Sequence, residues 1–268
     1  MSAATTGDRR VGGARIAPPD VRDEARAPTP MAVDLGSSRL RVWGLARGTV
    51  SAPTAERSRR TPLVRRGRLV DVAGCTAVLR RLWHRLDPAA QPPPLVVACR
   101  PALATPADEQ TMREVLTAAL SPCRLLFIDT VRAAAIGAGS AAGALLIADI
   151  GAQITEVGLL CDGHVVTSRR ANLGTADLTE DVTVHVLAAV TARLVREVYQ
   201  HTADRQQILA ALARGMVVVG GGAAQPDLIA ALARALRIAV RAAAAPHTAA
   251  LTGAGLAAMS AVRHPGPA

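Results

Sequence analysis

One short segment occurs twice in this chain and constrains its fold more than any other feature. MAVDLGSSRLRVW (31–43) and ALLIADIGAQITEVGLL (144–160) both place an apolar run, an Asp, a Gly two residues later and a second apolar run in order. This order predicts a strand, a tight turn and a second strand. An acid at the tip of a buried strand, beside turn amides, can hold Mg²⁺ through water and face a phosphate. We therefore expect two related halves, with Asp34 and Asp149 at equivalent places.

Helices and strands alternate after each hairpin, which predicts an α/β fold with a mostly parallel sheet covered by helices in each half. Residues 48–66 are expected to form a loop with at most one short strand. Thr105, Pro106 and Asp108 have the order of a helix N-cap, a first-turn proline and an N-terminal acid. The expected strands are 31–35, 40–46, 67–71, 95–99, 125–128, 144–149, 154–161, 164–169, 216–219 and 237–241, and the expected helices are 72–86, 106–120, 131–138, 177–201, 204–213, 226–236 and 249–262.

Composition narrows the function class. The chain has 268 residues and a formal charge of +10, and its basic side chains are all arginine. These arginines are scattered and are not interleaved with aromatic residues, so we expect a solvated basic surface and no nucleic-acid partner. The cysteines lack C-x-x-C spacing and the histidines lack metal-ligand spacing, so we expect buried reduced thiols at Cys99 and Cys161. The polar N-terminus predicts a cytoplasmic protein, with peripheral membrane contact as a further option.

Several ordered segments resemble the actin/Hsp70 ATPase superfamily, and most closely its bacterial actin (MreB) family. VDLGSSRLRVW (33–43) and ADIGAQITEV (148–157) resemble the two phosphate loops, and FIDTVRAAAIGAG (127–139) resembles the segment that joins the lobes. GMVVVGGGAAQPDL (215–228) resembles the adenosine loop, and LTGAGLAAM (251–259) the returning C-terminal helix. Several ordered matches are much harder to obtain by chance than one glycine-rich motif.

The resemblance implies two duplicated actin-like (ribonuclease H-like) lobes, each a mixed sheet with helices, with the family's two small insertion subdomains largely absent. The implied divisions are a disordered tail (1–30), a first core lobe (31–141), a second core lobe (142–248), a C-terminal helix returning to the first lobe (249–263) and a short tail (264–268).

ATP and Mg²⁺ are the cofactors that this resemblance implies. Asp34 and Asp149 match the acids that hold Mg²⁺ through water. The residues that match nucleotide-binding positions are Asp34, Gly36, Ser37, Ser38, Asp149, Gly151, Thr155, Gly220, Gly221 and Gly222. The same acids could instead cap local turn amides, and the glycine triplet could simply end a strand and allow close helix packing.

The departures from the family pattern predict weak hydrolysis or none. Thr130 stands where the family has its water-orienting Glu, and a positioned base contributes typically ~10²–10⁴-fold. We read Thr130 as a helix N-cap rather than a catalytic group. Arg39 replaces a small polar residue and is either a phosphate ligand or a plug. The face formed by Leu178, Val182, Val186, Ala189 and Leu194 is either core or a partner surface exposed by the missing insertion.

These features predict a truncated MreB-like actin in cell-shape or cell-wall organisation, a nucleotide-binding or pseudo-ATPase scaffold. Its expected partners are proteins of the cell-wall or division machinery, and self-association is a further expectation. The alternative is a small Hsp70-like chaperone or reactivating factor of the same superfamily. A sugar or acetate kinase would need a catalytic acid and a substrate-binding insertion, and the sequence shows neither.

Overall fold

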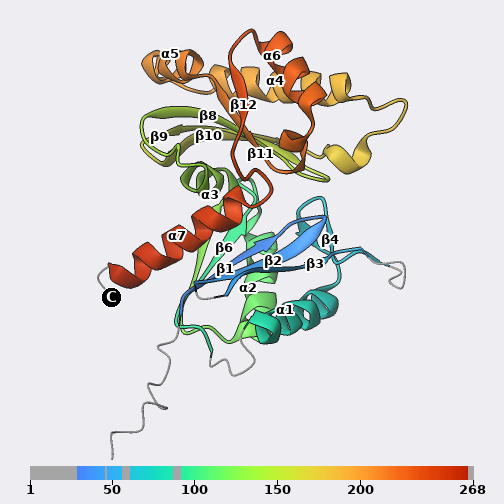
Figure 1. Cartoon of the computed structure of the whole chain (residues 1–268), viewed down its shortest axis with the longest axis vertical. Helices are drawn as coiled ribbons and strands as arrows, with labels where there is room; N and C mark the ends of the chain where they lie inside the picture. The colour runs from blue at the N-terminus through green and yellow to red at the C-terminus, as the bar shows by residue number, and fades with distance from the viewer. Residues whose placement is uncertain (1–28, 46, 56–60, 87–91, 265–268) are drawn as a thin grey trace, which may run out of the picture.

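Two similar halves are stacked one above the other (Figure 1). The computed structural model describes residues 29–45, 47–55, 61–86 and 92–264. The expected tails, 1–30 and 264–268, therefore fall outside the described residues except at 29–30 and 264. None of the helices in the described part of the chain combines the length and the apolar character needed to span a bilayer.

The first half is built on a five-stranded sheet with the order β3-β2-β1-β6-β7. β1, β2 and β3 form an antiparallel meander, and β1, β6 and β7 run parallel. Helices α1 and α2 pack on one face of this sheet, where their apolar residues form one core with Met31, Val33, Leu40 and Val42. The elements are β1 (Met31–Leu35), β2 (Arg39–Gly44), β3 (Gly48–Pro53), α1 (Val72–Leu86), β6 (Val96–Arg100), α2 (Pro106–Leu120) and β7 (Leu125–Asp129).

The second half repeats this plan, with the strand order β10-β9-β8-β11-β12. The β8–β9–β10 meander is antiparallel, and β8, β11 and β12 are parallel, so both sheets are mixed. Helices α4, α5 and α6 pack on its outer face. The elements are β8 (Ala144–Ile150), β9 (Thr155–Cys161), β10 (His164–Ala171), α4 (Val184–Gln200), α5 (Arg205–Arg214), β11 (Met216–Val219), α6 (Pro226–Leu236) and β12 (Val240–Ala242).

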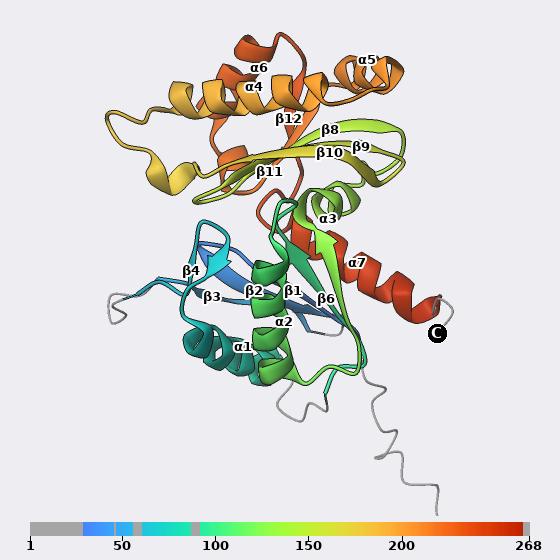
Figure 2. The same ribbon diagram turned by 180° about the vertical axis from the view of Figure 1, so that it is seen from behind.

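Two helices lie between the sheets and belong to the packing of both halves (Figure 2). α3 (Thr130–Gly137) packs against the inner face of the second sheet, where Val131 and Ala134 meet Leu145 and Ile147. α7 (Ala249–Arg263) places its small apolar residues against the inner face of the first sheet. The duplicated sheets therefore enclose a shared helical layer.

Most expected elements are present with bounds within two residues, because their signals are local. α2 begins as predicted: the Thr105 side chain accepts from the backbone N–H of Asp108, and the Asp108 carboxylate accepts from the backbone N–H of Thr105. The strand expected at 67–71 is only β5 (Arg68–Leu69), which forms a small hairpin with β4 (Val64–Arg65). The strand at 48–53 is one residue pair longer than a loop reading implies, and it forms a full edge of the sheet.

The helix expected at 177–201 starts later than its apolar spacing suggests. Residues 175–177 form a 3-10 turn, and α4 begins only after the N-cap Thr183. Val186 and Ala189 are exposed, whereas the buried face of α4 comprises Leu187, Ala188, Thr191, Ala192, Leu194, Val195 and Val198. The expected apolar face was therefore out of phase with the true one. Cys99 is buried as expected, but Cys161 is only partly buried.

Candidate functional site

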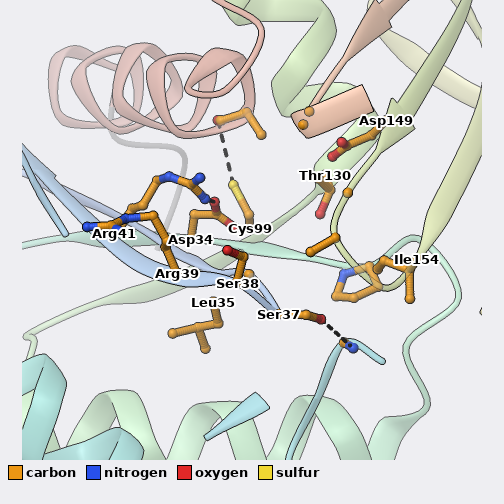
Figure 3. A pocket seen from close by; sticks show the side chains of 18 of the residues that line it. Asp34, Leu35, Ser37, Ser38, Arg39, Arg41, Cys99, Thr130, Asp149 and Ile154 are labelled. Atoms are coloured by element: carbon orange, nitrogen blue, oxygen red, sulfur yellow. Dashed lines mark hydrogen bonds and ion pairs between the residues drawn. The ribbon is translucent and has the colours of Figure 1, made fainter. Parts of the chain in front are cut away.

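A cavity of about 300 Å³ lies between the two halves (Figure 3). Both hairpin turns, the start of α3 and the glycine-rich segment after β11 contribute to it. Its lining includes Asp34, Gly36, Ser37, Ser38, Arg39, Arg41, Thr130, Asp149, Gly151, Ile154, Thr175, Gly220, Gly221 and His247. The acids Asp34 and Asp149 thus come from different sheets and face one cavity.

Strand periodicity explains why both acids point inward. Side chains alternate between the two faces of a strand. Ala32 on β1 and Ile147 on β8 lie on the inner faces of their sheets. Asp34 and Asp149 are each two residues further along, so they share those faces and lie at the ends of the strands.

The two hairpins have the same register. Leu35 pairs with Leu40 around a four-residue turn, and Ile150 pairs with Thr155 around another. The Gly36 and Gly151 turns therefore occupy equivalent places on opposite walls of the cavity. Ser37 lines the first turn, and its hydroxyl accepts from the backbone N–H of Gly67 at 3.2 Å.

Arg41 is a site residue that the sequence analysis missed. It lies directly opposite Asp34 in the β1–β2 ladder, so the two side chains share one face. Arg41 Nη1 lies 3.0 Å from Asp34 Oδ2, and the two side chains are only 19% and 18% exposed. Burial raises the pKa of Asp34, and Arg41 opposes that rise. Counting residues outward from the four-residue turn would have found this pair.

Glu156 holds the equivalent place in the second hairpin, opposite Asp149. It is buried, and its Oε1 accepts from the backbone N–H of Ala102 at 2.8 Å, a contact that joins the two halves. Burial, followed by the charge of Asp149, raises the pKa of Glu156 to about 8. Burial, followed by the charge of Asp34, raises the pKa of Asp149 to about 7. The second acid of the site therefore sits in an environment that disfavours negative charge.

Two predicted nucleotide-binding residues lie outside the cavity lining. Thr155 is fully buried and pairs with Ile150, and its hydroxyl donates to the Leu173 carbonyl at 2.8 Å. Gly222 is buried against Ile150. Gly220 and Gly221 do line the cavity. Gly220 has a φ of 80°, and a Cβ there would overlap Asp149 Oδ1, so the close approach of this segment requires glycine.

The structure also places the two residues whose roles the sequence left open. The Arg39 guanidinium lines the cavity but is held by the Ser51 hydroxyl, at 3.1 Å from Nε and 2.9 Å from Nη2. Thr130 is the first residue of α3 and not its N-cap, which is Asp129. Its hydroxyl donates to the Arg100 carbonyl at 2.9 Å, so the N-cap reading of Thr130 was wrong.

Arg66 reaches across the mouth of the cavity from the first half to the second. It lies in the two-residue β4–β5 turn, where Arg66 and Gly67 both have positive φ, as a type I′ turn requires. Its guanidinium makes a two-pronged contact with Asp177, with both N–O distances 2.6 Å. Nη1 also donates to the Gln153 carbonyl at 2.8 Å. These residues lie 111 positions apart or nearly so, and no local pattern indicates the contact.

The described residues contain no group of three or more His, Cys, Asp or Glu side chains able to hold a metal ion. Cys99 borders the cavity, but its thiol is buried and donates to the Ala250 carbonyl on α7. Burial raises the pKa of this thiol, so a structural role fits it better than a nucleophilic one.

Comparisons with known proteins agree with this architecture. The family model described as MreB/Mbl protein matches residues 28–194. MreB5 of Spiroplasma citri, solved with ADP and with AMPPNP, superimposes with a TM-score of 0.77 in both structures. The ADP-bound structure is 14% identical, and the match covers 89% of this chain and 98% of that one.

Two further solved structures share the fold. The MamK double helical filament superimposes with a TM-score of 0.71 at 14% identity, over 86% of this chain and 98% of that one. Ethanolamine utilization protein EutJ from Carboxydothermus hydrogenoformans superimposes with a TM-score of 0.62 at 18% identity, over 85% of this chain and 89% of that one. No curated protein sequence matches the chain.

Proposed function

Because the chain belongs to the MreB/Mbl protein family, we propose that it acts as a shortened MreB-like actin in cell-shape or cell-wall organisation. The observation that carries this proposal is the family match over residues 28–194, together with two equivalent acidic hairpins that face one cavity. Between β3 and α1 the described residues hold only the β4–β5 hairpin, and between β10 and α4 only a 3-10 turn. The protein would thus work with the two core lobes of an actin.

The cavity is the place where we expect a nucleotide. Its glycine turns, at Gly36, Gly151 and Gly220, bring backbone to the surface where phosphate oxygens can approach. MreB5, which has the same fold, was solved with ADP and with AMPPNP. The volume is at the lower end of the range for ligand pockets.

Hydrolysis should be weak or absent in this cleft. Thr130 cannot act as a general base at neutral pH, and its hydroxyl proton is already donated to the Arg100 carbonyl. We therefore propose a nucleotide-binding scaffold that works through protein partners and self-association. The structure of MamK as a double helical filament supports self-association. The chaperone alternative is not favoured: the family model is that of MreB/Mbl, and the likeness to EutJ shows only the fold.

Nucleotide binding and turnover can be measured separately on the purified full chain. We expect a fluorescent ATP analogue to bind and inorganic phosphate release to stay near background. Asp149→Ala should weaken binding without changing the background rate. Robust phosphate release that Asp149→Ala abolishes would contradict the scaffold proposal.

Self-association is tested by sedimentation of the full chain with and without ATP. We expect nucleotide to shift protein into the pellet, with filaments visible by negative-stain electron microscopy. A protein that stays monomeric at all concentrations with bound ATP would contradict this part of the proposal.

A further inference from the structure

The counter-ion of this cavity is the subject of the inference, which rests on the proposed nucleotide binding. We propose that the guanidinium of Arg41 takes the place of the magnesium ion, so that the cavity binds nucleotide phosphates without a divalent cation. The ligand class is a nucleoside di- or triphosphate.

The residues present do not fit a magnesium ion held by Asp34. Such an ion keeps most of its water and needs free carboxylate oxygens for those waters. Asp34 Oδ2 already accepts from Arg41 Nη1 at 3.0 Å. A divalent ion bridged to the same carboxylate would lie next to a permanent positive charge, because an arginine stays protonated in proteins. The ion and the guanidinium would therefore compete for one carboxylate.

The guanidinium also lies where a phosphate would meet the first turn. A Cβ built on Gly36 would be 3.4 Å from Arg41 Nη1 and 3.8 Å from Asp34 Oδ2. The Gly36 turn, Arg41 and Asp34 thus form one wall of the cavity, as Figure 3 shows for the two charged side chains. A guanidinium has five N–H donors, so pairing with one carboxylate leaves donors for a phosphate.

Backbone register holds Arg41 in this position. Asp34 and Arg41 are directly opposed on adjacent antiparallel strands, and their side chains are mostly buried. Asp34 acts as a positioning residue that orients the guanidinium. Arg39, two residues earlier on the same strand, also lines the cavity and adds a second positive charge to this wall.

The second hairpin does not supply such a cation. Its residue equivalent to Arg41 is Glu156, whose carboxylate is tied to the backbone N–H of Ala102 at 2.8 Å. The duplicated hairpins therefore have unequal roles: the first carries the positive charge, and the second contributes turn backbone and Asp149.

The test is ATP binding by the full chain, measured calorimetrically in excess magnesium chloride and in EDTA. We expect the two dissociation constants to agree within about twofold, since the charge-assisted hydrogen bonds come from the protein itself. Arg41→Leu should lose at least about tenfold in affinity in EDTA, as expected for loss of a hydrogen bond to a charged group. It should regain part of that loss in magnesium. Arg81→Leu, an exposed position on α1, is the matched control and should bind as the wild type does.

Each outcome separates the inference from the proposed function. Binding by the wild type that requires magnesium would overturn the inference and leave nucleotide binding intact. Unchanged affinity of Arg41→Leu in EDTA would overturn the role of Arg41. A protein that binds ATP in neither buffer would contradict both. The wild-type comparison needs no variant, so it decides the matter even if Arg41→Leu does not fold.

Discussion

At the scale of single residues, equivalent positions in the two hairpins have opposite charges. Asp34 faces Arg41, whereas Asp149 faces Glu156. The first pair is a partly buried ion pair, and the second places two acids on one inner face. A buried acid beside another acid is held towards its neutral form. The same backbone plan therefore gives two electrostatically different walls.

Glu156 makes the stability of this protein depend on pH. Its pKa is raised from 4.5 to about 8, so the folded state holds the proton more tightly than the unfolded chain does. The resulting stabilisation is complete below about pH 4.5 and is lost as the pH rises through about 8. The free energy of unfolding should fall by at most about 1.4 kcal/mol per pH unit across this window on account of Glu156.

Glu156→Gln should remove that contribution, because an amide oxygen can still accept from Ala102 but carries no charge. In metal-free buffer, urea unfolding should show the variant gaining stability relative to the wild type between pH 5 and pH 8. Asp149 keeps some pH dependence in both proteins. Glu180→Gln, at an exposed position, is the control and should leave the profile unchanged. Parallel profiles for Glu156→Gln and the wild type would contradict the expectation.

At the scale of elements, the crossing of α3 and α7 places the start of each half of the cavity. Gly137 on α3 lies against the Ala249 carbonyl, and Gly253 on α7 lies against the Ala133 carbonyl. A Cβ at either position would overlap the facing backbone. The helices can approach this closely only because both positions are glycine, which gives a physical reason for the small-residue string at 133–139.

Gly253→Ala should destabilise the protein by about 2–4 kcal/mol, since backbone cannot yield as a side chain can. The sign is informative, because an alanine in an unconstrained helix would instead stabilise by about 1 kcal/mol. Thermal and urea unfolding measure the change. Thr252→Ala, the exposed neighbour on α7, is the control and should change stability little. A Gly253→Ala protein as stable as the wild type would show that the crossing is looser.

α4 shows where element-scale reasoning from sequence fails. Leu178 and Val182 have helical spacing with the residues that follow, but Asp177 is bound by Arg66 and accepts from the backbone N–H of Gly174 at 2.9 Å. These contacts hold the chain in a turn. The local signal that remained was Thr183, whose side chain caps α4 by accepting from the backbone N–H of Val186.

At the scale of the whole molecule, the halves are joined in two places. The shared α3–α7 layer forms apolar cores with both sheets. Arg66 joins the cavity mouth through Asp177 and Gln153, and Arg170 adds a hydrogen bond to the Arg66 carbonyl. The apolar layer acts at the back of the cleft and the polar contact at its mouth, so opening of the cavity requires loss of the Arg66 contacts first.

Arg66→Ala should therefore loosen the mouth without unfolding either half. We expect hydrogen exchange to become several-fold faster in the β4–β5 hairpin and in the 151–154 turn, with no change in α1 or α4. Arg68→Ala is the matched control: its ion pair with Asp108, at 2.9 Å, lies within the first half. Equal exchange in the two variants would contradict a clamping role for Arg66.

The sequence by itself determined the duplicated hairpins, the positions of most helices and the inward direction of Asp34 and Asp149. These follow from strand alternation, turn glycines and helix caps, which act within a few residues. The register of the hairpins, had it been counted, would also have given Arg41. Only the tertiary structure decided that Thr155 faces the core, that Arg66 meets Asp177 and that Cys99 meets α7, because these contacts join segments whose separation in the chain leaves no local pattern.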